Sequence, residues 1–401
     1  MKTCTKTSNH CAASAIHVAR RNREIILTQP NAEAEAIPLN PGQSIFDQAL
    51  EHRQRQGLEL TYQEKLRILD HLVGVPTRLD ITGGDALIVT ENMALLSQAA
   101  ARIGRENITL TATGAGLHRV NPAEVAGLIS ELNFTYDSAA LRNPHRPGAY
   151  ATANLAKAAE FAALGVKTRA ECPLSAHNIA LDHLTRLYTD LHEAGIDKLL
   201  IMRLFPSGRG AATAKDIPTP AQYRAAVAHL RSLEAHLGSP ALKLQCAMRF
   251  WDAPQNQREN PCDLLRESLG LMADGTLLTS AWALDGQGRP LDDAFVLGNL
   301  AKTPITQLLA SEKAQRQLAR LDENFGNCKI FSFFHSTKAS PEDRLFDTAD
   351  PLLTTAVAAI VPATATAGKD STDFFLPPQP FGNFGVTQVR PTKPADLVAV
   401  A

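Results

Sequence analysis

Strand-like and helix-like segments alternate from about residue 60 to residue 250, and this alternation leaves few folds open to the chain. The first helix-like segment is LTYQEKLRILDHLVG (60–74), in which Thr61 can cap the helix and Glu64 completes a capping box. Six strand-like segments follow: RLDITGG (78–84), NITLTAT (107–113), LNFTYDS (132–138), VKTRAECPL (166–174), KLLIMRLFP (198–206) and ALKLQCAMRF (241–250). Strands separated by helices predict right-handed crossovers and a parallel sheet, closed like a barrel or open and doubly wound. In both cases ligands bind at the carboxyl ends of the strands.

Composition excludes several classes of protein. The net charge is −1, so we expect no nucleic-acid partner and no attraction to an anionic membrane surface. No run reaches the roughly 18 apolar residues of a membrane span, because the nearest candidate, 352–367, is too short and contains Pro362. Six cysteines are too few for a disulfide scaffold, and no apolar segment of a secretory signal follows Met1. These features favour a cytoplasmic protein.

The alternating pattern ends near residue 250, which predicts a domain boundary there. Residues 1–250 form the barrel-like part, and residues 251–352 form a smaller module with a hairpin around the turn ADGT (273–276). Residues 353–401 are rich in Ala, Thr, Pro and Gly and are expected to be a weakly ordered tail.

Two short motifs carry the candidate chemistry. Cys4 and Cys11 lie near the start of the chain, with Ser8 at the place where a third cysteine would complete a C-x3-C-x2-C triplet. The second motif, Gly83-Gly84-Asp85, ends a predicted strand, where glycine lets the backbone approach a ligand and the carboxylate can receive an ammonium group.

In order and spacing, these motifs resemble the radical S-adenosylmethionine (SAM) enzymes, which join a cysteine loop to a strand-end Gly-Gly-Glu. Further segments resemble the same family: HCAASA (10–15), FTYDSA (134–139), RPGAY (146–150), CPLSAHN (172–178) and IMRLFPSGRG (201–210). In the smaller module, PCDLLRESLGLMADGTLLTSAW (261–282), LGNL (297–300) and NCKIF (327–331) resemble the SPASM or twitch extension. The resemblance implies an α/β fold, a partial (β/α)6 TIM-like barrel with a smaller C-terminal auxiliary module, in which the first strand is missing because only three residues precede Cys4.

The family chemistry implies a set of cofactors and site residues. A 4Fe-4S cluster on Cys4, Ser8 and Cys11 would bind SAM and cleave it reductively to a radical that abstracts hydrogen from a substrate. An electron donor such as flavodoxin or ferredoxin is implied, and the substrate is a peptide or a small molecule. The implied SAM-binding residues are Gly83, Gly84, Asp85, Asp137, Asn178 and Arg203. Cys246, Cys262 and Cys328 are the ligands available for an auxiliary iron–sulfur cluster.

The sequence departs from the family pattern, and two alternatives follow. Serine is a harder and more basic ligand than cysteine, so Ser8 should weaken the cluster. Ser280 likewise stands where the module should carry a cysteine. The chain is then either a working enzyme or a cluster-poor relative that acts as a binding scaffold.

A nucleotide-dependent oxidoreductase is a further reading, based on the loop TATGAGLHRV (111–120). Its fit is poor, because Arg119 replaces the third glycine and the next helix is expected only at Asn121.

Overall fold

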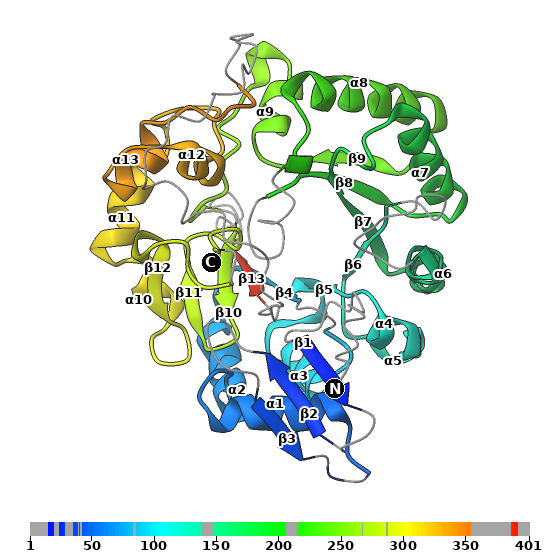
Figure 1. Cartoon of the computed structure of the whole chain (residues 1–401), viewed down its shortest axis with the longest axis vertical. Helices are drawn as coiled ribbons and strands as arrows, with labels where there is room; N and C mark the ends of the chain where they lie inside the picture. Colours follow the sequence, from blue (N-terminus) through cyan, green and yellow to red (C-terminus); the bar gives the residue numbers. More distant parts are fainter. Residues whose placement is uncertain are drawn as a thin grey trace, which may run out of the picture.

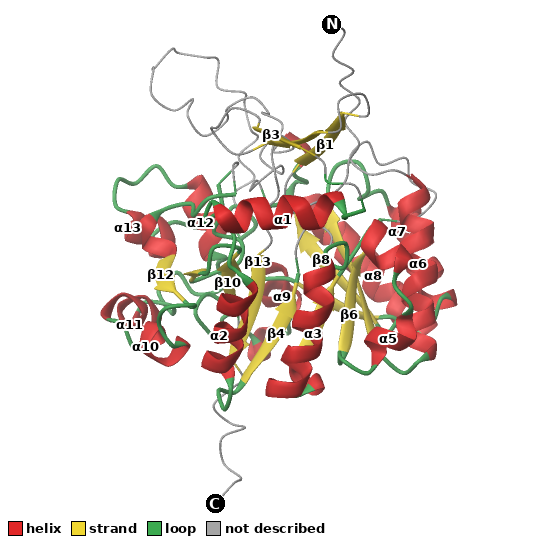
Figure 2. Cartoon of the chain, turned by 90° about the horizontal axis from the view of Figure 1, so that it is seen from below, coloured by secondary structure: helices red, strands yellow, loops and turns green. Residues whose placement is uncertain are grey.

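The computed structural model of the protein describes residues 15–19, 24–28, 35–38, 40, 42–82, 86–137, 148–205, 215–266, 268–285, 288–353 and 386–391. Two sheets are present in this part of the chain. The smaller sheet is antiparallel, and it comprises β1 (Ala15–Ala19), β2 (Glu24–Thr28) and β3 (Glu35–Pro38). It lies beside helix α1 (Ile45–Arg55), as Figure 2 shows. The larger sheet has ten strands and curves as an arc with helices on its outer side (Figure 1).

The six predicted parallel strands are confirmed, in the predicted order. They are β4 (Thr77–Ile81), β5 (Ile108–Thr111), β6 (Glu131–Thr135), β7 (Lys167–Leu174), β8 (Lys198–Arg203) and β9 (Ala241–Leu244). The helices before and between them are α2 (Tyr62–Leu72), α3 (Thr90–Ile103), α4 (Ala115–Arg119), α5 (Pro122–Ala126), α6 (Gly148–Ala163), α7 (Leu181–Glu193) and α8 (Pro220–Leu237). Helix α2 begins with the predicted capping box of Thr61 and Glu64. The chain is therefore an α/β protein with a partial TIM-like barrel.

The two faces of the parallel strands differ in polarity. The outer face packs under the helices and is apolar, and its buried side chains include Leu79, Ile81, Ile108, Leu110, Leu132, Phe134, Ala170, Leu199 and Ile201. The inner face carries polar side chains: Arg78, Asp80, Thr109, Thr111, Glu131, Asn133, Arg169, Glu171 and Lys198. The interior of a TIM barrel is usually filled by branched apolar side chains. Here the inner face of β4 to β7 is mostly polar, and apolar side chains such as Leu200 and Met202 appear on this face in β8.

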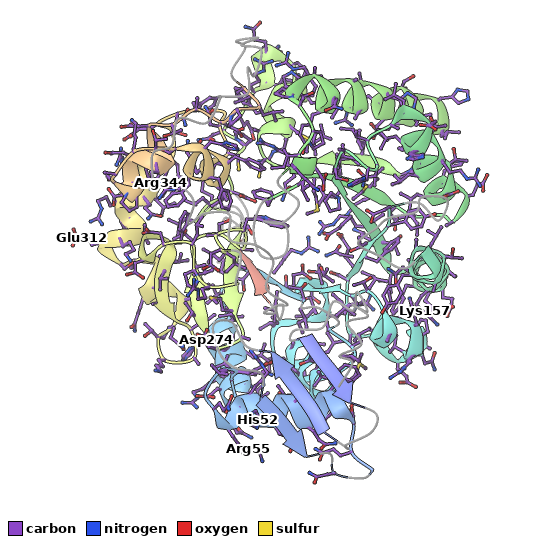
Figure 3. All side chains as sticks on the ribbon, in the orientation of Figure 1. His52, Arg55, Lys157, Asp274, Glu312 and Arg344 are labelled. Carbon is purple, nitrogen blue, oxygen red and sulfur yellow. The ribbon has the colours of Figure 1, made fainter. Side chains whose placement is uncertain are left out.

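Antiparallel strands extend the same sheet beyond β4. The order at this end is β12 (Val296–Asn299), β11 (Thr276–Leu278), β10 (Leu269–Met272), β13 (Val386–Pro391) and then β4. Strands β10 and β11 form the predicted ADGT hairpin, in which Gly275 has a φ of +88° and Asp274 accepts a hydrogen bond from the Thr276 backbone. Asp274 is labelled in Figure 3.

Residues 386–391, which fall within the predicted weakly ordered tail, form strand β13, and the tail as a whole stays a prediction. Their VTQVRP sequence is rich in β-branched residues, and the edge of β4 offers unpaired backbone groups for them to bond.

Short helices complete the C-terminal part of the described chain. They are α9 (Ala247–Asp252), α10 (Ile305–Leu309), α11 (Glu312–Ala319), α12 (Lys329–His335) and α13 (Pro341–Phe346). None of the helices described is long and apolar enough to cross a bilayer.

Candidate functional site

Half of the predicted site lies outside the described residues. This holds for the predicted cluster ligands Cys4, Ser8 and Cys11 and for the Gly83-Gly84-Asp85 motif at the end of β4. Within the described ranges, no group of three or more His, Cys, Asp or Glu residues is arranged to hold a metal ion. The predicted cluster loop and the strand-end motif therefore stay predictions.

Asp137 and Asn178 come together at the carboxyl ends of β6 and β7, with Cys172 between them. The Cys172 sulfur lies 3.8 Å from Asp137 Oδ1 and 3.7 Å from Asn178 Nδ2. Asn178 Oδ1 also accepts a hydrogen bond of 2.7 Å from the Ser175 backbone, and its Nδ2 donates to the Pro173 carbonyl. Asn178 thus shapes the loop after β7. Cys172 is fully buried on the outer, apolar face, as expected of a structural thiol.

Arg203, at the end of β8, is enclosed by the C-terminal part of the chain. Its Nη1 lies 2.5 Å from Asp350 Oδ2, and the guanidinium carbon lies 3.4 Å from the centre of the Phe331 ring. Both charged side chains are at least 96% buried. Arg203 was predicted to hold SAM, and its planar group is here already engaged in joining the barrel to residues 327–352.

Aromatic side chains pack around this ion pair. Phe205, two residues after Arg203, stacks on Trp282 with ring centres 4.8 Å apart and contacts Phe331 at 4.6 Å. Phe331 also stacks on His335 of the same helix. The carboxyl end of β8 is therefore bordered by an aromatic wall, which consists of Phe205 after β8, Trp282 in the β11–β12 connection and Phe331 on α12.

A chain of ion pairs crosses the inner face near the amino-terminal ends of β6, β7 and β8. Glu131, the first residue of β6, lies 2.6 Å from Lys198 Nζ and 3.5 Å from Arg169 Nη1. Arg169 also pairs with Glu171 at 2.9 Å. Burial alone would raise the pKa of Glu131, but Arg169 and Lys198 hold the pKa below its usual value of 4.5.

Replacing Glu131 with Gln should make the free energy of unfolding less dependent on pH in the acidic range. Because the folded-state pKa is depressed, the carboxylate contributes stability above pH 4.5, and this contribution is lost as the pH falls through the folded-state value. Urea unfolding measured from pH 7 to pH 3 should therefore show a shallower decline in the variant, from a lower starting value. Glu160→Gln removes a carboxylate that is 52% exposed and should keep the wild-type slope. Equal slopes for wild type and Glu131→Gln would contradict this account.

The glycine loop 111–120 differs from the prediction. Helix α4 begins directly after Gly114, whose φ is +85°, and not at Asn121, where the second helix α5 is capped. The Gly114 backbone N–H is nevertheless engaged, because it donates to Asn154 Oδ1 at 3.3 Å. The same oxygen lies 2.8 Å from His118 Nε2. A one-turn helix whose first N–H bonds a buried side chain offers no pyrophosphate site.

The three cysteines predicted as auxiliary ligands are all buried in the core. A side-chain hydrogen bond with Cys328, followed by burial, raises the pKa of the Cys246 thiol, and burial raises the pKa of Cys262 to about 12. Lys329 lies beside them, with Nζ donating to the Glu323 and Asn324 carbonyls. Iron–sulfur clusters bind cysteine thiolates, and the role of these three cysteines as auxiliary ligands stays a prediction.

Comparison with solved structures identifies the architecture. The chain shares its fold with SuiB of Streptococcus suis. SuiB bound to its precursor peptide SuiA matches with a TM-score of 0.53 and 12% sequence identity, covering 79% of this chain and 82% of SuiB. SuiB bound to S-adenosylmethionine matches with a TM-score of 0.52, and SuiB alone with 0.51, both at 12% identity. These matches cover 79% and 70% of this chain and 82% and 69% of SuiB, respectively. No family model and no curated protein sequence matches the chain.

The polar inner wall of this SuiB-like fold was not predicted from the sequence. A signal was present, because the segments RLDIT and ELNFT alternate polar and apolar residues. Strands of a parallel sheet that is buried on both faces are expected to be continuously apolar. The alternation therefore indicated that one face of the sheet is not packed by apolar side chains.

Proposed function

We propose that this protein is a radical SAM enzyme that modifies a peptide substrate in the cytoplasm. The observation that carries the proposal is the fold shared with SuiB, one structure of which holds SAM and another a precursor peptide. The shared fold supports the resemblance of the Cys4–Cys11 loop and the strand-end Gly-Gly-Asp motif to that family. A fold alone does not define a reaction, so the proposal depends on those motifs as well.

The described residues have distinct parts in this proposal. Asp137 lies at the carboxyl end of β6, where ligands of barrel folds bind, and it can accept hydrogen bonds from the ribose or from the substrate. Asn178 acts through the loop after β7, which it holds in shape. Arg203 positions the aromatic wall beside the site. The polar inner face receives the substrate.

The cofactors are assigned to the motifs outside the described residues. Cys4, Cys11 and Ser8 would hold a 4Fe-4S cluster, and Gly83, Gly84 and Asp85 would meet the SAM ammonium group. When bound, the cluster and SAM together supply the electron transfer and the hydrogen-abstracting group, with flavodoxin or ferredoxin as the electron donor.

The test is anaerobic reconstitution with iron and sulfide, carried out on the wild type and on Ser8→Cys. Iron and sulfide are counted per chain, and 5′-deoxyadenosine is measured after reduction with dithionite in the presence of SAM. Four irons and SAM cleavage in both proteins support the enzyme. Cleavage in Ser8→Cys alone would favour a cluster-poor binding scaffold, which Ser8 already suggests. Neither product in either protein would refute the radical SAM assignment.

A further inference from the structure

An incompletely paired group of acceptors lies on the inner face of the barrel. Asp80 on β4 is 5% exposed, and Asn133 on β6 is 1% exposed. Strand β5 lies between β4 and β6, and its Thr109 and Thr111 side chains are on the same face. Thr109 is the register partner of Asp80, and Thr111 is the register partner of Asn133. Partners in register point to the same side of a sheet, so all of these side chains face the interior.

Hydrogen bonding fixes the orientation of this group. Thr111 Oγ1 lies 2.8 Å and 3.0 Å from the two oxygens of Asp80, and a carboxylate can only accept, so the hydroxyl donates its single proton to Asp80. Asn133 Nδ2, 3.0 Å from the same hydroxyl oxygen, must therefore be the donor to it. The amide oxygen of Asn133 points elsewhere and has no partner among the described residues.

The Asn133 amide oxygen is consequently left without a donor, and the Asp80 carboxylate shares a single hydroxyl proton. A buried carbonyl oxygen with no hydrogen bond is costly, and a buried carboxylate that shares one hydroxyl is costlier. Within the described chain, no Lys, Arg or His lies within ion-pair distance of Asp80. Among the other charged groups on this face, Glu131, Glu171, Arg169 and Lys198 pair with one another, and Arg169 also interacts with Asp80 over a longer distance than an ion pair. Lys167 and Lys243 lie on the same face by register, and Arg78 has no ion pair with any described residue.

Solvent reaches this part of the inner face. Thr111 and Thr135 are partly exposed, and so are the Glu171 and Lys198 side chains, at 19% and 29%. The Thr111 side chain, which contacts both Asp80 and Asn133, is thus partly exposed to solvent, whereas the apolar side chains on the outer face of the same strands are buried.

We propose that Asp80 and Asn133, held by Thr111, form a subsite for a protonated amine of the substrate, such as a lysine side chain or a peptide amino terminus. The ammonium group donates one hydrogen bond to the Asp80 carboxylate and one to Asn133 Oδ1, which satisfies both acceptors and neutralises the buried charge. The assignment to a substrate rests on the proposed function, whereas the binding of an amine does not.

The test is a thermal-unfolding titration of the full-length protein without iron or SAM. The probe is n-butylammonium chloride, compared with the neutral 1-butanol at constant ionic strength. We expect the midpoint to rise with n-butylammonium and not with 1-butanol, because only the ammonium group binds the folded state at this subsite. Asp80→Asn should weaken the apparent affinity at least tenfold. Asp70→Asn, which changes a 61% exposed carboxylate on α2, should leave it unchanged.

A second variant, Asn133→Asp, keeps the proposal testable if Asp80→Asn does not fold. Asn133→Asp adds a carboxylate and should tighten n-butylammonium binding at least threefold. Equal midpoint shifts with the two probes, or equal affinities in wild type, Asp80→Asn and Asn133→Asp, would overturn the proposal and leave only ordered water at these acceptors. The titration contains no SAM, so a negative result would refute the amine subsite without affecting the evidence from SAM cleavage. Equally, the absence of SAM cleavage would refute the radical SAM assignment without affecting a positive titration.

Discussion

Replacing Asp350 with Ala should lower the free energy of unfolding by about 3–5 kcal/mol, because removing one partner leaves a buried charge uncompensated. Asp350 is fully buried and pairs with Arg203 of β8. Its two oxygens also accept hydrogen bonds from the Cys328 and Leu352 backbones, at 3.3 Å and 2.9 Å. The variant therefore loses the ion pair and two loop contacts at once. Urea denaturation followed by circular dichroism measures the change.

Asp347→Ala is the matched control for this prediction. Asp347 is 45% exposed and lies 3.1 Å from Lys338 on the surface, so its removal should cost less than about 1 kcal/mol. A double variant Arg203→Met with Asp350→Ala should be less destabilised than the sum of the two single variants, since it no longer buries a lone charge. If Asp350→Ala costs no more than Asp347→Ala, the ion pair does not hold the barrel to the C-terminal residues.

Phe331→Ala should be destabilised by a similar amount, about 3–5 kcal/mol, because a large buried ring is replaced by a cavity. The Phe331 side chain is fully buried, and it contacts Phe205 and the Arg203 guanidinium. Phe325→Ala removes the same atoms from a ring that is 47% exposed, and it should cost about 1 kcal/mol or less. Thermal and urea unfolding of both variants would test the difference. Equal losses would show that the aromatic wall is not part of the stabilising core.

Local patterns in the sequence predicted the parallel half of the fold. The six strands, the capping box at Thr61 and the ADGT hairpin depend on neighbouring residues, and the structure contains all three as predicted. Strand β13 could not be found in this way, because its pairing partner β4 lies some 300 residues earlier in the chain. Only the free edge of β4 explains why this short segment pairs there.

Contacts between site residues that lie far apart in the chain could not be predicted from the sequence either. The ion pair of Arg203 with Asp350, which lies 147 residues further on, could not be predicted, and a SAM-binding role of Arg203 stays a prediction. The inner-face group shows the same limit. Asp80, Thr111 and Asn133 come from three strands, and only the register of β4, β5 and β6 brings them together.

The electron paramagnetic resonance spectrum of the reduced, reconstituted protein, recorded with and without SAM, tests the central claim most directly. If sulfur ligands from Cys4 and Cys11 hold an iron cluster with an open position, SAM binds next to the unpaired electron and must alter the signal. We predict a four-iron signal whose line shape changes when SAM is added. A four-iron signal that is identical with and without SAM would contradict the account.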